Sequence, residues 1–559
     1  STPLPTPFSL PCSLPLLHVT FGSWFFSAPS TIFRKQLSSR FSMNISTDKS
    51  LIGFKRNSVR FFLILLVSTL PILLTVLFLS HTGLGQITDY VPGVPNDTVG
   101  YWHYILTFSE VGFNGGYYSP DESITPIDFI RFDVHGPMFP IIYGSVARLI
   151  GWQPYTGTII NLVFLSSTLF AFMFVARLDH IQIIVLGILV GSYWPLQLTL
   201  PIIMQETFHY SMSLLIAAII ACLLLQPNIN KKVVVVFAIF IFIVSLVRFS
   251  WALIYVPVLI LALRPLNWKR LIWAFLISAT LTTAILLTFR WITPPGFNTI
   301  LDTLALFQQS FQSGWVAMLK AFQKNWDAYL VILNMYGGYN VEAHASILLI
   351  LLVFLALGGL LLTLILRSSN VVLRYELVFH LLNLVPFTFL VFILYAAFNF
   401  YRILSIPIFL SILILLIRRR WWLIAVIIIM NLYFSNAFLQ TYARYGSEYH
   451  LDHNQLETWR QDFRQYIAFD PAAVNPWCNT LYIPIELYDS RLTTLPAGIG
   501  INWSHRPVNQ QYPLKSRYLL FDDAKDGGRF DTLRDRLNVQ LLGRLSIGDL
   551  YLNLDAACP

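Results

Sequence analysis

Long apolar runs constrain this chain more than any other feature of its sequence. Runs of 17–25 residues recur through the first 440 positions, and each is long enough to cross the roughly 30 Å hydrocarbon core of a bilayer. Hydrophobic residues make up 56% of the chain and charged residues 12%, whereas about 25% of a soluble globular protein is charged. The composition therefore excludes a wholly soluble protein and predicts a polytopic α-helical membrane protein.

We predict eleven transmembrane helices from the apolar runs and the charges between them. They lie near residues 60–80, 158–176, 181–200, 206–226, 232–248, 250–263, 270–289, 346–366, 375–397, 403–417 and 421–438. With a cytoplasmic N-terminus, the basic clusters between spans, from Lys231 and Lys232 to the arginines at 418–420, all fall on the cytosolic side. The net charge of +9 therefore indicates membrane orientation and not nucleic-acid binding.

The sequence predicts three parts. Residues 1–42 are rich in Ser, Pro and Phe and contain no acidic residue, so we interpret them as an unstructured extension, with a transit-like targeting segment as the alternative. Residues 43–438 form the transmembrane domain, with long outer loops at 81–157 and 290–345. Residues 439–559 have a soluble composition and, with an odd number of spans before them, are expected to form an extracytoplasmic domain.

This C-terminal region has the pattern of a small α/β domain. We expect a helix at 456–467, strands at 480–485, 517–521, 539–545 and 550–554, and a helix at 530–537. Cys478 and Cys558 could pair if the region lies outside the cytosol, although spacing alone cannot show this. In the first outer loop, residues 137–152 are apolar but short, and we interpret them as an interfacial helix that ends at Gly151.

Candidate functional residues gather in the first predicted outer loop. Asp97 begins an aromatic-rich segment, and its carboxylate could accept a proton from an acceptor hydroxyl or help to hold Mg²⁺ or Mn²⁺. A histidine before a Gly-Pro turn, as at His135, could bind a phosphate or an acceptor. The other candidates for substrate binding in this loop are Asp89, Tyr101, Trp102 and His103. The alternative is that loop residues are only solvated, which we prefer for Asp121, Glu122 and Asp128.

Ionisable residues also stand near the outer ends of predicted spans. Glu206 and His209 belong to the span at 206–226, and charged groups at membrane depth are costly enough to indicate a function. Arg248 and the pair Tyr401 and Arg402 interrupt apolar sequence on the side that otherwise lacks basic residues. Arginine there is suited to a polyprenyl phosphate, because its planar fork gives bidentate hydrogen bonds. The alternative is that these side chains extend to lipid headgroups.

Taken in order, these segments resemble the GT-C superfamily of membrane glycosyltransferases, and within it the protein O-mannosyltransferase and aminoarabinose-transferase type. The resemblance covers roughly residues 60–438. At two positions the chain departs from the family: Asn96 stands where a second acid often lies, and Gly136 replaces the first proline of the usual pair. The residues that carry the resemblance are Asp97, Tyr101, Trp102, His135, Gly136, Pro137, Arg248, Tyr401 and Arg402.

The resemblance implies an inverting glycosyltransferase with a polyprenyl-phosphate sugar donor in the bilayer and a glycan, lipid or protein acceptor outside. Asp97 would be the general base, and Arg248 and Arg402 would stabilise the departing lipid phosphate. Glu206 and His209 would orient sugar or acceptor hydroxyls. Two other classes remain open: a transporter or lipid flippase without chemistry, and a structural or assembly protein of the membrane.

Overall fold

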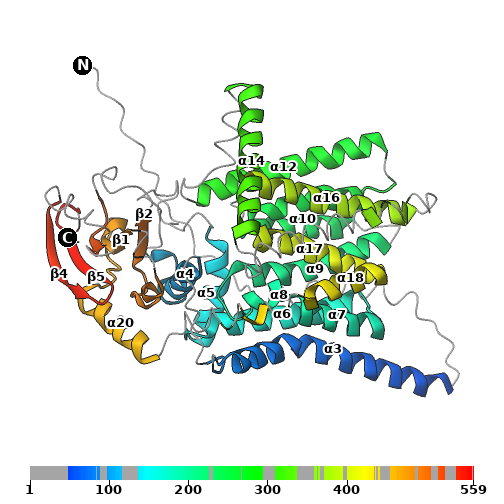
Figure 1. Ribbon diagram of the computed structural model, residues 1–559, viewed down its shortest axis with the longest axis horizontal. Coiled ribbons are helices and arrows are strands. Elements are labelled where there is room, and N and C mark those ends of the chain that lie inside the picture. The colour runs from blue at the N-terminus through cyan, green and yellow to red at the C-terminus, as the bar shows by residue number, and fades with distance from the viewer. Residues whose placement is uncertain are drawn as a thin grey trace. The chain divides into compact units, whose positions relative to one another are not determined.

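The structure is a computed structural model of the 559-residue chain (Figure 1). It describes residues 48–83, 85–88, 97–115, 136–225, 231–265, 267–293, 309–335, 371–394, 400–433, 453–484, 489–504, 514–522 and 537–556, with isolated positions at 358, 359, 361, 363, 364, 435, 438–440, 443, 487 and 558. The predicted extension at 1–42, the helix at 530–537 and most of the span at 346–366 lie outside these residues, as do Asp89 and His135.

The described chain is a helical membrane protein with a small sheet domain. Five helices are long and apolar enough to span a bilayer: Ser58–His81, Thr156–Val175, Gln205–Leu224, Trp268–Ile292 and Val371–Phe389. Five shorter apolar helices accompany them within the described ranges: Met138–Ile150, His180–Ser192, Phe249–Ala262, Arg402–Ile417 and Trp421–Tyr433. The predicted count of eleven spans therefore stays a prediction.

The helices before the C-terminal domain follow one another as α3 (Asp48–His81), α4 (Asp97–Val111), η1 (Gly112–Asn114), α5 (Met138–Ile150), α6 (Thr156–Val175), α7 (His180–Ser192), α8 (Trp194–Thr199), α9 (Gln205–Leu225), α10 (Lys231–Ser245), η3 (Phe249–Ile254), α11 (Tyr255–Ala262), α12 (Trp268–Ile292), α14 (Phe311–Met335), α16 (Val371–Leu394), α17 (Phe400–Ile417) and α18 (Trp421–Tyr433). The span predicted at 181–200 is interrupted in the structure, because α7 ends at Ser192 and α8 begins after Tyr193. Pro195 in the first turn of α8 has no amide hydrogen to continue the earlier helix.

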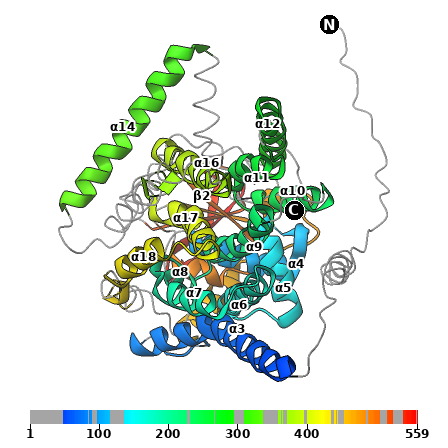
Figure 2. The ribbon, with the colours of Figure 1, turned by 90° about the vertical axis from the view of Figure 1, so that its right-hand side faces the viewer.

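Helix α9 lies at the centre of the packed helices. It contacts α6 on one side and α17 on the other, and Figure 2 shows it between them. Helix α17 also packs against α16, where the Asn383 side-chain amide donates to the carbonyl of Pro407 at 2.8 Å. Apolar side chains of α9 and α17 make up much of the core, including Leu214, Ile216, Leu404, Leu410 and Leu413, all of them fully buried.

The C-terminal domain contains helix α20 (His453–Tyr466), the short helices η5 (Pro476–Asn479) and η7 (Ser490–Thr494), and strands β1 (Thr480–Pro484), β2 (Gly500–Ser504), β3 (Tyr518–Phe521), β4 (Val539–Leu545) and β5 (Gly548–Asn553). The strand order is β2-β1-β3-β5-β4. Strand β1 is parallel to β2 and β3, while β5 is antiparallel to β3 and β4. Four of these strands overlap the strands predicted from the sequence, whereas β2 was not predicted.

The sequence left open whether Cys478 pairs with Cys558, and the structure pairs them. The two residues form a disulfide with Cα atoms 5.5 Å apart. Cys478 stands two residues before β1 and Cys558 five residues after β5, so the bond fastens the end of the chain beside the sheet. A cross-link of this kind stabilises a small domain mainly by restricting its unfolded chain.

Helix α4 is held between α5 and the C-terminal domain, and its contact with α5 is especially close. The helix predicted at 137–152 is present as α5, which ends at Ile150 and is followed by Gly151 at φ 86°, while its interfacial position stays a prediction. A Cβ atom at Gly144 of α5 would lie 2.8 Å from Phe108 Cβ and 3.1 Å from the carbonyl oxygen of Ile105, both on α4. Glycine is therefore required where α4 crosses α5.

We predict that Gly144→Ala destabilises the protein by about 1–3 kcal/mol, because the added methyl group overpacks the contact between α4 and α5. Thermal unfolding in detergent would measure the effect. Gly191→Ala in α7 is the matched control, since the nearest atom to its new Cβ would be Leu74 Cδ1 at 3.7 Å. An equal midpoint for Gly144→Ala and the control would contradict the proposed close packing.

Candidate functional site

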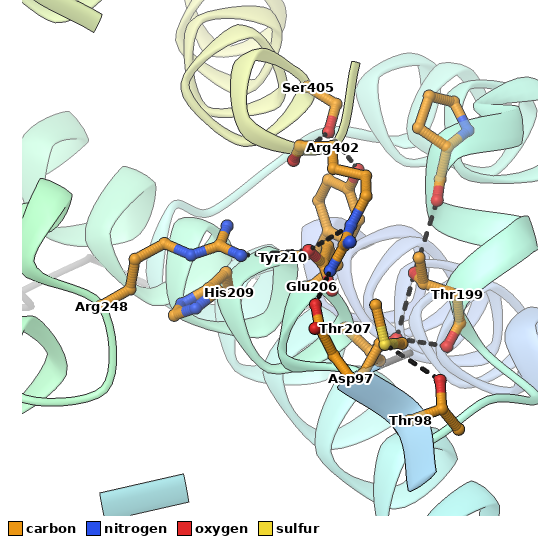
Figure 3. A network of polar contacts seen from close by, with 12 residues as sticks. Asp97, Thr98, Thr199, Glu206, Thr207, His209, Tyr210, Arg248, Arg402 and Ser405 are labelled. Carbon is orange, nitrogen blue, oxygen red and sulfur yellow. Dashed lines mark hydrogen bonds and ion pairs between the residues drawn. The ribbon is translucent and has the colours of Figure 1, made fainter. Parts of the chain in front are cut away.

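Four charged residues from four distant segments meet at one place. Asp97 is the first residue of α4, Glu206 the second residue of α9, and Arg402 the third residue of α17. Arg248 is the residue that precedes η3. Figure 3 shows Glu206 between the two arginines, with Asp97 on the far side of Arg402. We call these four residues the ion-pair network.

The arginines connect the carboxylates in a continuous chain. Arg248 donates from Nη2 to Glu206 Oε1 at 3.0 Å, and Arg402 donates from Nε to the same oxygen at 3.1 Å. Arg402 also donates from Nη2 to Asp97 Oδ2 at 3.0 Å. Two carboxylates and two guanidinium groups balance formally to zero, which lowers the cost of placing charges at the ends of apolar helices.

Burial differs sharply along the network. The side chain of Glu206 is 1% exposed, whereas Arg248 and Arg402 are 17% and 21% exposed and Asp97 is 31% exposed. The two arginine partners stabilise Glu206 as a carboxylate, because little solvent reaches it. Asp97 and Arg402 are the most exposed members of the network.

Hydroxyl groups behind the network fix the position of α17. Tyr210 and Ser405 share a hydrogen bond of 2.6 Å between α9 and α17, and the Tyr193 hydroxyl donates to the Ser405 carbonyl at 2.7 Å. Ser405 Oγ donates in turn to the carbonyl oxygen of Arg402 at 3.1 Å. These bonds hold the first turn of α17, and with it the start of the Arg402 side chain, against α9.

Two further predicted residues lie on the helices that build the network. His209 is one turn after Glu206 on α9, is completely buried, and accepts a hydrogen bond at Nδ1 from the indole nitrogen of Trp251 at 2.9 Å. Tyr401 precedes Arg402 in α17, but its side chain is outside the described residues. The structure thus brings together Asp97, Glu206, His209, Arg248 and Arg402.

The other predicted residues of α4 point elsewhere. Tyr101 and Trp102 are buried, and their rings pack edge-on against Phe139 and Trp152 at centroid distances of 5.0 and 5.8 Å. His103 is fully buried and lies 2.6 Å through Nε2 from the carbonyl oxygen of Ile499 in the C-terminal domain. These three side chains pack α4 against its neighbours.

The divalent-metal expectation at Asp97 stays a prediction. No group of three or more His, Cys, Asp or Glu side chains able to hold a metal occurs within the described ranges. Both carboxylates of the network face guanidinium groups, which compete with a divalent cation for the same oxygens. We therefore derive no step through Mg²⁺ or Mn²⁺.

Sequence reasoning missed the neutral residues that support the network. Tyr210 lies in the same apolar run as Glu206, yet tyrosine in a membrane helix is common and carries no functional signal. Ser405 and Trp251 are likewise ordinary residues of apolar segments. Only their contacts across helices distinguish them, and those contacts join residues 42 and 195 positions apart.

We predict an acid-sensitive contact between α4 and the C-terminal domain. Burial lowers the pKa of His103 from its ordinary value of 6.5 to about 4, partly offset by the hydrogen bond to the Ile499 carbonyl. Between these values the unfolded chain binds more protons than the folded one, so stability falls as pH drops from 6.5 to 4, by up to about 3 kcal/mol.

His103→Gln would keep an amide donor for the Ile499 carbonyl without titrating in this range. Unfolding midpoints measured from pH 4 to pH 7.5 should therefore fall less steeply at acid pH for this variant than for the wild type. Parallel pH profiles for the two proteins would show that His103 does not contribute.

Comparisons with known proteins add no relative to this picture. No family model matches the chain, and no curated protein matches it. The ion-pair network and its surroundings are therefore the basis for inferring a function.

Proposed function

We propose that the chain is a membrane-embedded glycosyltransferase that moves a sugar from a polyprenyl-phosphate donor to an acceptor on the outer face of the membrane. The observation that carries this proposal is the ion-pair network, in which the partly exposed carboxylate of Asp97 pairs with Arg402 and the buried Glu206 joins Arg402 to Arg248. A general base for an acceptor hydroxyl and a cationic site for a leaving phosphate are the two groups that such a transfer needs.

Asp97 is the proposed general base. Its carboxylate is the most exposed member of the network, so an acceptor hydroxyl can approach it from the aqueous side. The acceptor oxygen forms the new bond to the anomeric carbon of the sugar while the bond from that carbon to the phosphate oxygen breaks. Asp97 takes the hydroxyl proton, and the electron pair of the broken bond stays on the phosphate. Attack from the face opposite the phosphate would invert the anomeric carbon.

The arginines are the proposed phosphate site. Arg402 is bound to Asp97 and Glu206 in the ion-pair network, so a lipid phosphate would replace the Asp97 carboxylate on Arg402. The exchange keeps the charge around Arg402 constant and leaves Asp97 able to accept a proton. Glu206 is held by Arg248 as well, and it would stay in place as the fixed part of the site.

The disulfide supports an extracytoplasmic location for the C-terminal domain. Bonds such as Cys478–Cys558 persist mainly in oxidising compartments and are rare in the cytosol. With the basic clusters between spans on the cytosolic side, α4 and the start of α17 would face the same compartment as this domain. The proposed acceptor would then be a glycan, lipid or protein outside the cytosol.

We predict that Asp97→Asn lowers transfer about 10²- to 10⁴-fold, because the general base is lost. A panel of farnesyl phosphate-linked hexoses and pentoses, incubated with the purified protein in nanodiscs, would be assayed for release of farnesyl phosphate. Stability should change by no more than about 1 kcal/mol, since Asp97 is partly solvated. Asp549→Asn, which removes a carboxylate near Arg544 in the sheet, is the control.

The same variant separates catalysis from binding. Farnesyl phosphate should bind Asp97→Asn at least as tightly as it binds the wild type, because a competing carboxylate has left Arg402. Weaker binding of farnesyl phosphate by Asp97→Asn would contradict the proposal that a lipid phosphate replaces the Asp97 carboxylate on Arg402. An intact sugar–phosphate bond throughout the panel with the wild type, together with movement of the donor across the bilayer, would favour a flippase instead.

We predict that Arg402→Lys weakens farnesyl phosphate binding about tenfold or more. Arginine reaches Asp97 and Glu206 through two different nitrogens, whereas lysine has a single nitrogen and cannot reproduce the fork. Arg419→Lys at the other end of α17 is the matched control, since it also lies in an ion pair. Wild-type binding by Arg402→Lys would leave Arg402 as a membrane anchor.

A further inference from the structure

We infer that Trp251 is a positioning residue that fixes His209 as a hydrogen-bond donor toward the phosphate of the donor lipid; this role rests on the proposed function of the ion-pair network. Trp251 lies in η3 and His209 lies on α9, and both side chains are buried. No motif in the sequence connects them, since they are 42 residues apart.

The direction of the hydrogen bond decides the tautomer of His209. The indole nitrogen of Trp251 carries a hydrogen and can only donate. Its bond of 2.9 Å to His209 Nδ1 therefore requires Nδ1 to accept. A neutral histidine with an accepting Nδ1 carries its proton on Nε2. The ring of His209 is thus held as an Nε2–H donor by one contact to a neighbouring segment.

The Trp251–His209 hydrogen bond joins the same two segments as the Arg248–Glu206 ion pair beside it. The backbone N–H of Trp251 bonds to the carbonyl of Arg248 at 3.1 Å, which places the two residues one turn apart. On α9, Glu206 and His209 are also one turn apart. Arg248 donates to Glu206 and Trp251 donates to His209, so the same two turns are joined by two parallel bonds. The start of η3 therefore positions both Arg248, which pairs with Glu206, and Trp251, which selects the tautomer of His209.

Three polar atoms around these bonds retain unused hydrogen-bonding capacity. His209 Nε2, Arg248 Nη1 and Glu206 Oε2 are buried and have no hydrogen-bond partner within the described part of the chain. Buried polar atoms in folded proteins are nearly always paired, and those that are not call for a functional explanation. Here two donors and one acceptor belong to the same pair of helical turns.

The chemistry of these atoms indicates what they recognise. Two donors, one of them charged, suit a phosphoryl oxygen, which can accept from both. The acceptor at Glu206 Oε2 suits a hydroxyl group next to that oxygen. A sugar phosphate carries both groups side by side. The other tautomer of His209 would turn a lone pair toward the phosphate, so Trp251 favours binding of an anion by excluding that tautomer.

The tautomer can be measured without any assay of activity. Protein labelled with ¹⁵N in the histidine rings, reconstituted in nanodiscs, would be studied by solid-state NMR, with His209 assigned by subtracting the spectrum of His209→Gln. We expect the wild type to show a protonated Nε2 and an unprotonated Nδ1 at neutral pH. A protonated Nδ1 in the wild type would overturn the inference. Because this spectrum does not require the Trp251→Phe variant, it tests the inference even if that variant does not fold.

A double-mutant cycle tests the function of the contact. Trp251→Phe keeps an aromatic ring but removes the indole donor, and it should weaken farnesyl phosphate binding about three- to tenfold, as expected for one lost hydrogen bond. In the His209→Gln background, the amide nitrogen can donate without a choice of tautomer. Trp251→Phe should therefore cause no further loss of farnesyl phosphate affinity in that background. An equal loss in both backgrounds would mean that Trp251 only packs against its neighbours.

The two experiments also separate this inference from the proposed function. Farnesol, which lacks the phosphate, serves as the negative control for binding. Failure of the wild type to bind farnesyl phosphate in preference to farnesol would overturn both the phosphate site and the donor role of His209. The Nε2–H tautomer in that case would still establish Trp251 as the residue that orients the ring.

Discussion

The arrangement of η3, α17 and α4 around α9 depends on a buried carboxylate. Glu206 is 1% exposed at the start of α9 and accepts from both Arg248 and Arg402 at the same oxygen. Removing one partner from a buried ion pair costs about 3–5 kcal/mol, because the remaining charge has no compensation. This penalty ties η3 and α17 to α9, and through the second bond of Arg402 it also ties α4. Apolar packing fills the space between these helices, but it gives little directional preference.

A second buried glutamate is bound by arginines at the other end of α17. Glu376 of α16 is fully buried, and Arg420 donates to both of its oxygens at 2.8 and 2.7 Å while Arg418 donates at 3.2 Å. Helix α17 thus begins with an arginine bound to one buried glutamate and is followed by arginines bound to another. A leucine-rich helix can slide or rotate against similar neighbours at little cost. Arginine guanidinium groups bound to buried glutamates at both ends of α17 prevent this sliding and rotation.

The sequence identified the charges of the site but not their pairing. Asp97, Glu206, Arg248 and Arg402 stood out because ionisable residues are rare in apolar sequence, and they occupy one network. Their separations of 42, 196 and 305 residues gave no sign of which would meet. Local pattern also could not show that His103 faces inward, because polar and apolar residues are mixed around α4 and nearly all of them are buried. Strand β2 was missed because Gly500–Ser504 is short and contains Gly, Asn and Ser.

The unequal burial of the network divides it into a fixed part and an exchangeable part. Ion pairs with solvent access contribute about 0–1 kcal/mol, whereas disrupting a buried one costs several times more. The pair of Asp97 and Arg402, at 31% and 21% exposure, is therefore easily replaced by another anion, while the bonds to Glu206 are not. Any anionic ligand of this site would compete with Asp97 first. The carboxylate that it displaces is the proposed general base, so under the proposed function binding and base activation would follow from the same exchange.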